Sequence, residues 1–127
     1  MIPRNRHTRV DYRAAQRRMD SHRDIVGFTA DYEAGDTTGM HHHDRAQLVH
    51  GEFGVMSVRA ERGAWLVPPG FAVWVPATME HQVVAVTALR MATLYVRDGT
   101  PIPTPPDCAV VVMPTLAREL ILRAVTL

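Results

Sequence analysis

The sequence predicts an all-β fold, a small sandwich or barrel, with a basic N-terminal arm and a C-terminal helix. Three observations predict it. Eight short strand-like runs follow one another from residue 25 to residue 113. Glycine, proline and charged turns separate these runs at short spacing, which is typical of sandwiches and barrels rather than of alternating strands and helices. The periodicity then changes to helical spacing at the end of the chain.

Length and composition predict one domain with an ordinary core, since the chain has 127 residues and is 46% hydrophobic. No window approaches the roughly 18 apolar residues of a membrane span, and no secretory signal opens the chain. The single cysteine, Cys108, cannot form an internal disulfide. We therefore expect a reducing compartment, the cytoplasm, and no membrane partner.

The basic arm comprises residues 1–24, where seven arginines stand against three aspartates, so that this segment is +4 and the remaining chain −3. Such an arm can contact phosphate groups of nucleic acid. The alternative is a solvated or partly helical terminus, and residues 11–23 could form a short helix. The net charge of +1 gives no general attraction to nucleic acid.

The predicted barrel covers residues 25–112. Its first run alternates Val26, Phe28, Ala30 and Tyr32, which indicates a half-buried strand. The next runs are AQLVH, GVMSVRA, AWLV, FAVWV, HQVVAV and LRMATLYV. The proline-rich stretch DGTPIPTPPD then ends this series of strands, because proline has no N–H to donate to the hydrogen bonds of a central strand. After it, VVVM is predicted to form one more short strand.

The predicted helix covers residues 113–127, and Pro114 and Thr115 suit its start. Apolar residues recur at helical spacing, and Leu122 widens the apolar surface around the helix. A helix that is apolar over most of its circumference must be covered on more than one side. We therefore expect a homodimer in which this helix takes part. The residues predicted to carry the contact are Ala117, Leu120, Ile121 and Ala124.

The stretch GMHHHDRAQLVHGEFG holds four histidines within ten positions. A solvated loop would need polar neighbours, whereas this run is flanked by Leu48, Val49 and Phe53. On a strand, residues two apart point to the same side. His41, His43 and Gln47 would then share one face, and His81 is the candidate for a further ligand from another strand.

Two motifs resemble those of the cupins. The first cupin motif, G-x5-H-x-H-x3/4-E-x6-G, is matched in spacing from Gly35 to Gly54, with glutamine in place of glutamate. The second, G-x5-P-x-G-x2-H-x3-N, is matched by Gly70, Pro76 and His81. Thr78 replaces the second glycine of this motif, and Ala85 replaces its asparagine. Two such motifs in order imply a cupin barrel, the double-stranded β-helix or jelly roll.

The cupin resemblance implies a ligand set, which carries over as His41, His43, Gln47 and His81. Imidazoles with an amide oxygen suit a divalent transition metal, Zn or Ni ahead of Fe, Mn or Cu. The neutral glutamine removes a carboxylate that would offset the metal charge, so affinity should be lower than in a three-histidine, one-carboxylate site. The alternative is a metal-free polar interior hydrogen-bonded to water or ligand.

A narrower resemblance spans roughly residues 25–127. RAQLVHGEFGVMSV, GAWLVPPGFAVWVPATMEHQV, LRMATLYV and CAVVVMPTLARELILRA are similar to the N-terminal sensing domain of AraC-family transcription regulators. This implies that the barrel binds a small effector and that the helix relays occupancy to a helix-turn-helix DNA-binding domain absent from this chain. DNA would then be contacted only through that C-terminal domain.

The other function left open is a stand-alone cupin metalloenzyme, a dioxygenase or isomerase. No carboxylate occupies the motif positions, which favours the regulator over the enzyme. Either function needs a small cavity with a few polar anchors. An inward Arg90 would suit an anionic effector, while a surface arginine is its alternative, and Trp74 could be a core residue instead. The residues proposed for the pocket are Arg90, Trp74, Met91 and Tyr95.

Overall fold

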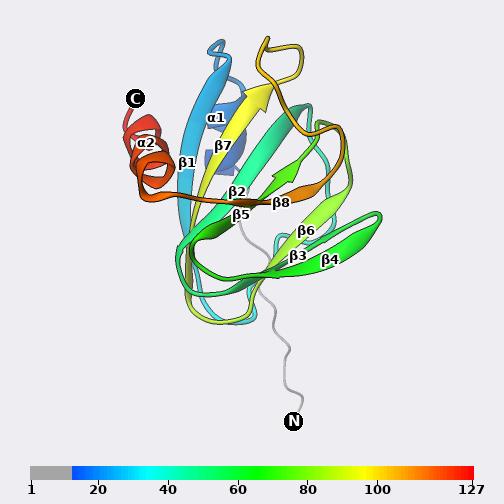
Figure 1. Ribbon diagram of the computed structural model, residues 1–127, viewed down its shortest axis with the longest axis vertical. Helices are drawn as coiled ribbons and strands as arrows, with labels where there is room; N and C mark the ends of the chain where they lie inside the picture. Colours follow the sequence, from blue (N-terminus) through cyan, green and yellow to red (C-terminus); the bar gives the residue numbers. More distant parts are fainter. Residues whose placement is uncertain (1–12) are drawn as a thin grey trace.

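The computed structural model describes residues 13–127, whose strands form two antiparallel sheets (Figure 1). The larger sheet has the order β1-β7-β2-β5-β8 and the smaller the order β4-β3-β6. The larger sheet contains β1 (Ile25–Tyr32), β2 (Arg45–Phe53), β5 (Phe71–Val75), β7 (Leu89–Arg97) and β8 (Ala109–Val112). The smaller contains β3 (Met56–Ala60), β4 (Gly63–Val67) and β6 (His81–Ala85). The prediction of an all-β fold with a C-terminal helix is confirmed.

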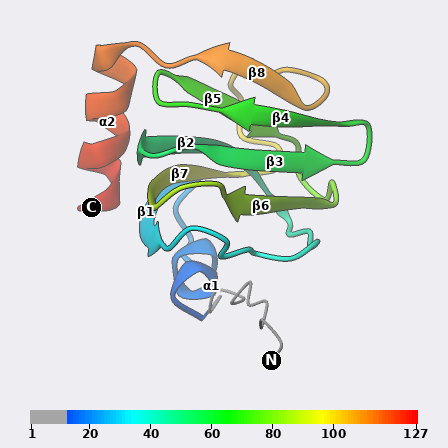
Figure 2. The same ribbon diagram turned by 90° about the horizontal axis from the view of Figure 1, so that it is seen from below.

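The two sheets lie in layers, with the smaller sheet in front of the larger in Figure 2. Alternate residues of each strand point between them, and these side chains form the main core. The larger sheet contributes Val49, Val73 and Met91, and the smaller sheet contributes Met56, Val58 and Val83. The spacing of apolar residues along each strand therefore decides which face is buried.

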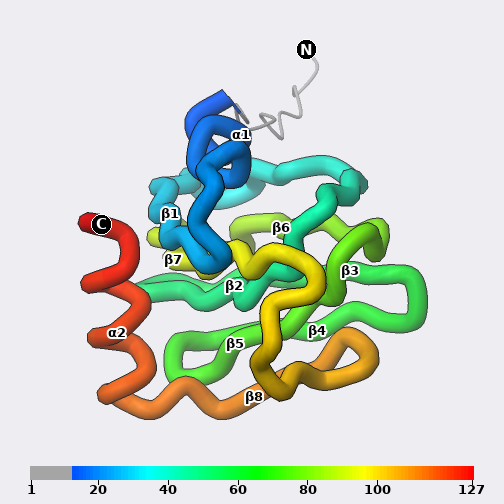
Figure 3. Tube along the Cα trace, turned by 90° about the horizontal axis from the view of Figure 1, so that it is seen from above, coloured from blue at the N-terminus to red at the C-terminus, as the bar shows by residue number. Residues whose placement is uncertain are grey.

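Helix α1 (Arg13–Met19) lies beside β1 at one end of the barrel (Figure 3). Its Ala15 is buried and packs with Val26 and Tyr95, whose side chains belong to the inner face of the larger sheet. The buried guanidinium of Arg45 donates to the carbonyls of residues 19, 21, 23 and 24, which connect α1 to β1. These bonds hold α1 against the mouth of the barrel.

Helix α2 (Thr115–Val125) starts next to β8 and ends next to β1 (Figure 3), on the outer face of the larger sheet. Ile121 packs there against Ala72 and Ala92. Small residues let the helix come close: a Cβ on Gly27 would lie 2.7 Å from the backbone nitrogen of Val125. Neither helix of the described residues is long and apolar enough to span a membrane.

The expected helix surface is placed differently from the prediction. Ile121 is buried against its own barrel, while Ala117 and Ala124 are half-buried. Of the four residues expected at a dimer contact, only Leu120 is exposed, at 61%. The reason is that the small residues Ala72 and Ala92 on the outer face of the larger sheet receive Ile121. The expected basic arm falls partly outside the described residues, since its first twelve positions precede residue 13.

Candidate metal and effector site

The first two site histidines lie on the segment that precedes β2. This segment runs antiparallel to β6, and His41 and His81 exchange two backbone hydrogen bonds of 2.9 and 2.8 Å. The strand expected through residues 41–47 is shorter than predicted, because β2 begins only at Arg45. The pairing with β6 nevertheless turns His41 toward His81, as a regular strand would.

The four residues expected as ligands are brought together inside the barrel. The ring centroids of His41 and His81 are 4.3 Å apart, and those of His43 and His81 are 5.1 Å apart. One nitrogen from each of the three rings lies within 4.8 Å of the others. The amide oxygen of Gln47 is 3.1 Å from Nε2 of His43 and 3.2 Å from Nε2 of His81.

Backbone carbonyls fix the orientation of all three rings. His41 Nδ1 donates to Gly39 O at 2.9 Å, and His81 Nδ1 donates to Met79 O at 2.9 Å. His43 Nδ1 donates to Arg45 O at 2.7 Å. A neutral imidazole that uses Nδ1 as donor carries its lone pair on Nε2. The three rings are therefore held in the tautomer that a metal ligand needs.

The rings are neutral at physiological pH. Burial lowers the pKa of His41 and His43 below the usual value, and it lowers the pKa of His81 to about 4. The hydrogen bond from each Nδ1 to a carbonyl acts in the other direction but does not outweigh the loss of solvation. Neutral imidazole is the form that binds metal, so protons do not compete for these nitrogens near pH 7.

The contact between Gln47 and the rings is an electrostatic conflict in the absence of a cation. Its amide oxygen faces two Nε2 atoms, and in neutral rings whose Nδ1 carries the proton these are acceptors as well. Two arrangements resolve the conflict. The amide can turn so that its NH₂ donates to the rings, or a cation can lie between the nitrogens and the oxygen.

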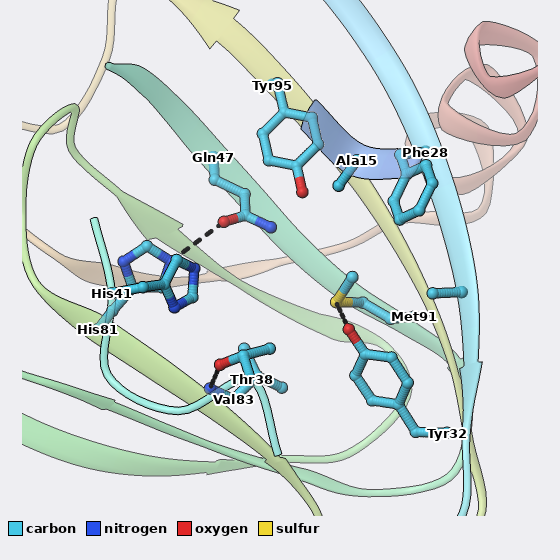
Figure 4. A pocket seen from close by; sticks show the side chains of 11 residues that line it. Ala15, Phe28, Tyr32, Thr38, His41, Gln47, His81, Val83, Met91 and Tyr95 are labelled. Atoms are coloured by element: carbon cyan, nitrogen blue, oxygen red, sulfur yellow. Dashed lines mark hydrogen bonds between the residues drawn. The ribbon is translucent and has the colours of Figure 1, made fainter. Parts of the chain in front are cut away.

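A cavity of about 40 Å³ adjoins this cluster (Figure 4). His41, His81 and Gln47 line one side of it, and the side chains of Phe28, Tyr32 and Met91 line the other. Ala15 of α1 closes it together with Tyr95. A volume of this size holds roughly three water-sized groups. The cavity therefore has one polar end and one apolar end.

The four residues proposed for the pocket lie on opposite faces of the larger sheet. Met91 and Tyr95 line the cavity. Arg90 and Trp74 lie on the outer face instead. Arg90 is exposed and donates to Asp31 at 2.7 and 3.3 Å, which holds the pKa of that carboxyl below its usual value. Trp74 packs with Ala46 and Val96. Neighbouring residues of one strand face opposite ways, so Arg90 could not accompany Met91 into the cavity.

Several lining residues were missed by the sequence reasoning. Phe28 and Tyr32 line the cavity, and the alternation that predicted their strand could have placed them there. Thr38 lines it too, and its hydroxyl accepts from Val83 N at 2.9 Å. No local signal pointed to Thr38 or to Ala15, because each reaches the cavity through contacts with a distant part of the chain.

Comparisons with known proteins agree with this geometry. Residues 22–100 match the family described as "AraC-like ligand binding domain". A curated relative is the HTH-type transcriptional regulator NimR of Escherichia coli, 30% identical over 86 residues. This match covers 68% of the chain and 31% of that regulator, so the chain spans about a third of its length.

Several solved structures have a similar fold. An RmlC-like cupin from Shewanella frigidimarina has a TM-score of 0.55 and 16% identity, covering 60% of this chain and 68% of that one. A conserved protein of unknown function from Streptococcus pyogenes has a TM-score of 0.58 and 20% identity, covering 63% and 70%. The match to oxalate decarboxylase has a TM-score of 0.55 and 13% identity, and it covers 61% of this chain and 22% of that one.

These likenesses confirm the cupin barrel, and at such identities they show the fold alone. The family match covers most of the barrel, including all four clustered residues. The chain belongs to the family of AraC-like ligand-binding domains, the cupin-like sensing domains of AraC-type transcription regulators.

Proposed function

We propose that this chain is the effector-sensing and dimerisation domain of a cytoplasmic transcription regulator, and that it binds a divalent transition metal together with a small effector. The observation that carries the metal part is the convergence of one ring nitrogen from each of three histidines, with the amide oxygen of Gln47 beside Nε2 of His43 and of His81. Family membership supports the sensing part, while DNA binding would belong to a further domain of the whole protein.

The donor set fits a metal in chemistry, and its spacing would contract on binding. Two nitrogens bound to one tetrahedral zinc ion at about 2.1 Å lie about 3.4 Å apart. The three ring nitrogens lie within 4.8 Å of one another, so the widest pair would close by about 1.4 Å at most. His41, His43, His81 and Gln47 would hold the ion, with Zn or Ni ahead of Fe, Mn or Cu as the expected metal.

The bound ion would supply positive charge at the polar end of the cavity. The chain's own residues hold the three rings in one tautomer and keep them neutral, and Ala15 of α1 lines the cavity. Among the described lining residues there is no carboxylate to act as a general base. Glu80 bonds instead to the exposed His42. This lining supports sensing over the alternative of a cupin dioxygenase or isomerase.

Two contacts support a relay from the cavity to α2. Arg118 of α2 donates twice to Glu52 at 2.9 Å, and Glu52 lies on β2, the strand that carries Gln47. Arg18 of α1 reaches carbonyls at the end of α2. Exposed leucines on the outer side of α2 support pairing of two copies.

The metal is tested on protein made without an affinity tag. We expect a stoichiometric divalent transition metal by elemental analysis, and a loss of tenfold or more in metal affinity for His43→Ala. The matched control is His42→Ala, because this neighbouring histidine is exposed and pairs with Glu80 outside the cavity. Protein that takes up no metal, or equal affinities for the two variants, would overturn the metal site.

A further inference from the structure

We propose that the effector of this domain is a compact anion, a short-chain carboxylate that binds with its carboxylate on the metal and its apolar end toward Phe28, Tyr32 and Met91. This inference rests on the metal site proposed above and names the ligand class that the same site would take. The inference follows from the absence of charged side chains among the described residues that line the cavity.

The first step is the charge of the donors. A divalent ion held by His41, His43, His81 and Gln47 would keep its full charge of +2, because all four side chains are neutral. Among the described residues, the rest of the cavity lining contains no aspartate, glutamate, lysine or arginine. Uncompensated charge in a buried site is costly, so a ligand that brings negative charge is favoured over a neutral one.

The second step is that nearby carboxylates do not supply this charge. Glu80 is half-exposed and bonds to Nδ1 of His42 at 3.0 Å, outside the cavity. Glu52 lies near His50 and Arg118 on the outer face, beneath α2. Asp44, next to His43, and Glu80 are exposed and therefore screened, and Glu52 is paired with Arg118. A charge inside the cavity would act at full strength. The compensating anion is therefore expected from the effector.

The third step is the shape of the cavity. Its volume of about 40 Å³ leaves room for only a few atoms besides an ion. The wall away from the histidines is apolar, formed by Phe28, Tyr32 and Met91, whose sulfur accepts the hydroxyl of Tyr32. A carboxylate with a short alkyl group matches one polar and one apolar end. A longer chain would press against α1, since Ala15 lines the cavity.

The test uses propionate as the probe and propionamide as its uncharged isostere. Both are titrated by calorimetry into cobalt-loaded and metal-free protein in chloride-free buffer, and the visible cobalt spectrum reports ligand exchange at the metal. We expect propionate to bind the loaded protein at least tenfold more tightly than propionamide, with no binding to metal-free protein. Acetate should bind roughly fourfold more weakly than propionate, the effect of one methylene.

A charge variant separates this inference from the metal site itself. Gln47→Glu places a carboxylate among the donors, so it should keep or raise cobalt affinity but weaken propionate tenfold or more. The control is Gln82→Glu, which adds the same charge next to His81 but on the outward, half-buried side of β6. It should leave both affinities close to those of the parent chain.

The outcomes distinguish the two proposals. Protein that takes up no cobalt refutes the metal site, and the anion inference falls with it. Cobalt uptake with equal binding of propionate and propionamide overturns the anion inference alone. So does propionate binding that persists in metal-free protein. If Gln47→Glu fails to fold by circular dichroism, the comparison of the two ligands on the parent chain still decides.

Discussion

Thr78 is the one non-glycine residue of the described chain with a positive φ, at 68°. This left-handed conformation costs a side chain with a Cβ about 1–2 kcal/mol, and more for a β-branched one. The strain sits at the turn before β6, where Thr78 N donates to His43 O at 2.8 Å. The second cupin motif has glycine at this position, so the strain follows directly from the substitution.

We expect Thr78→Gly to stabilise the protein by about 0.5–1 kcal/mol, because relief of strain exceeds the added entropy of the unfolded chain. The measurement is the free energy of unfolding in urea. The control is Thr104→Gly, an exposed threonine with an ordinary φ, which should lose stability. A loss of stability in both variants would show that the Thr78 turn is not strained.

The buried histidines predict a pH dependence of the metal-free protein. Burial lowers the pKa of His81 to about 4, whereas an unfolded histidine titrates near 6.5. Between these values the unfolded chain binds more protons than the folded one. The unfolding free energy should therefore fall as pH drops below 6.5, by up to about 1.4 kcal/mol per pH unit for this one group. His41 and His43 act in the same direction.

Urea denaturation with a chelator present, from pH 7.5 down to pH 5, measures this slope. His22→Gln should keep the parent slope, because His22 is exposed and lies outside the barrel. His81→Gln should flatten it. A parent slope near zero would mean that the three rings are protonated in the folded state, against the tautomers inferred above.

Sequence reasoning at the residue scale named four side chains that lie together in the structure, and two proposed pocket residues that lie on the outer face. The spacing of His41, His43 and Gln47 was informative because residues two or four apart share a face in any extended segment, even one outside a regular strand. Arg90 and Trp74 point outward because each alternates along its strand with residues that face the core. The role of Arg45 had no local signal, because its four partners lie more than 20 positions away.

The two helices are joined by one side chain. Arg18 of α1 donates from Nε to Gly27 O at 2.7 Å and from Nη1 to Leu127 O at 3.1 Å. Its Nη2 lies 3.4 Å from Val125 O and 3.5 Å from Ala124 O. The last carbonyls of a helix lack internal partners, and a cation near them is favourable by up to about 2 kcal/mol. Arg18 thus caps α2 and fixes α1 to β1.

We expect Arg18→Ala to lower the unfolding free energy by about 1–2 kcal/mol and to speed amide exchange in the last turn of α2. Arg17→Ala is the matched control, since its side chain is exposed on the same helix. It should change neither quantity by more than about 0.5 kcal/mol. Equal exchange rates in the two variants would show that the cap does not order α2.

Elements were predicted from the sequence more reliably than their packing. The strand runs and the C-terminal helix could be recognised because glycine, proline and a change of period mark their limits. The face that α2 buries could not be predicted from the sequence. It depends on small residues on three different strands: Ala72 and Ala92 receive Ile121, and Gly27 lies against the end of α2. Only the assembled sheet shows which side of the helix this surface accepts.

At the scale of the whole molecule, the outer side of α2 remains uncovered. Leu116 and Leu120 are 71% and 61% exposed, and residues four positions apart fall on one face of a helix. Leu127, which follows the end of α2, is 57% exposed. Burying each leucine against a partner is worth about 1.5–3 kcal/mol before the cost of association. A second copy of the chain presents the same face, and a twofold pair is the commonest closed arrangement.

The size of this surface sets the expected affinity. A helix of 11 residues is about 16 Å long, so a contact made by α2 alone is smaller than the roughly 800 Å² per partner of a standard interface. We therefore expect a dimer that forms at micromolar concentration and dissociates on dilution, with its mass measured by light scattering. Leu120→Glu should leave a monomer. Leu66→Glu changes a leucine on β4 that is more exposed than Leu120, and it should leave the dimer intact. A monomer at every concentration, or a dimer that Leu120→Glu does not weaken, would show that α2 is not the contact.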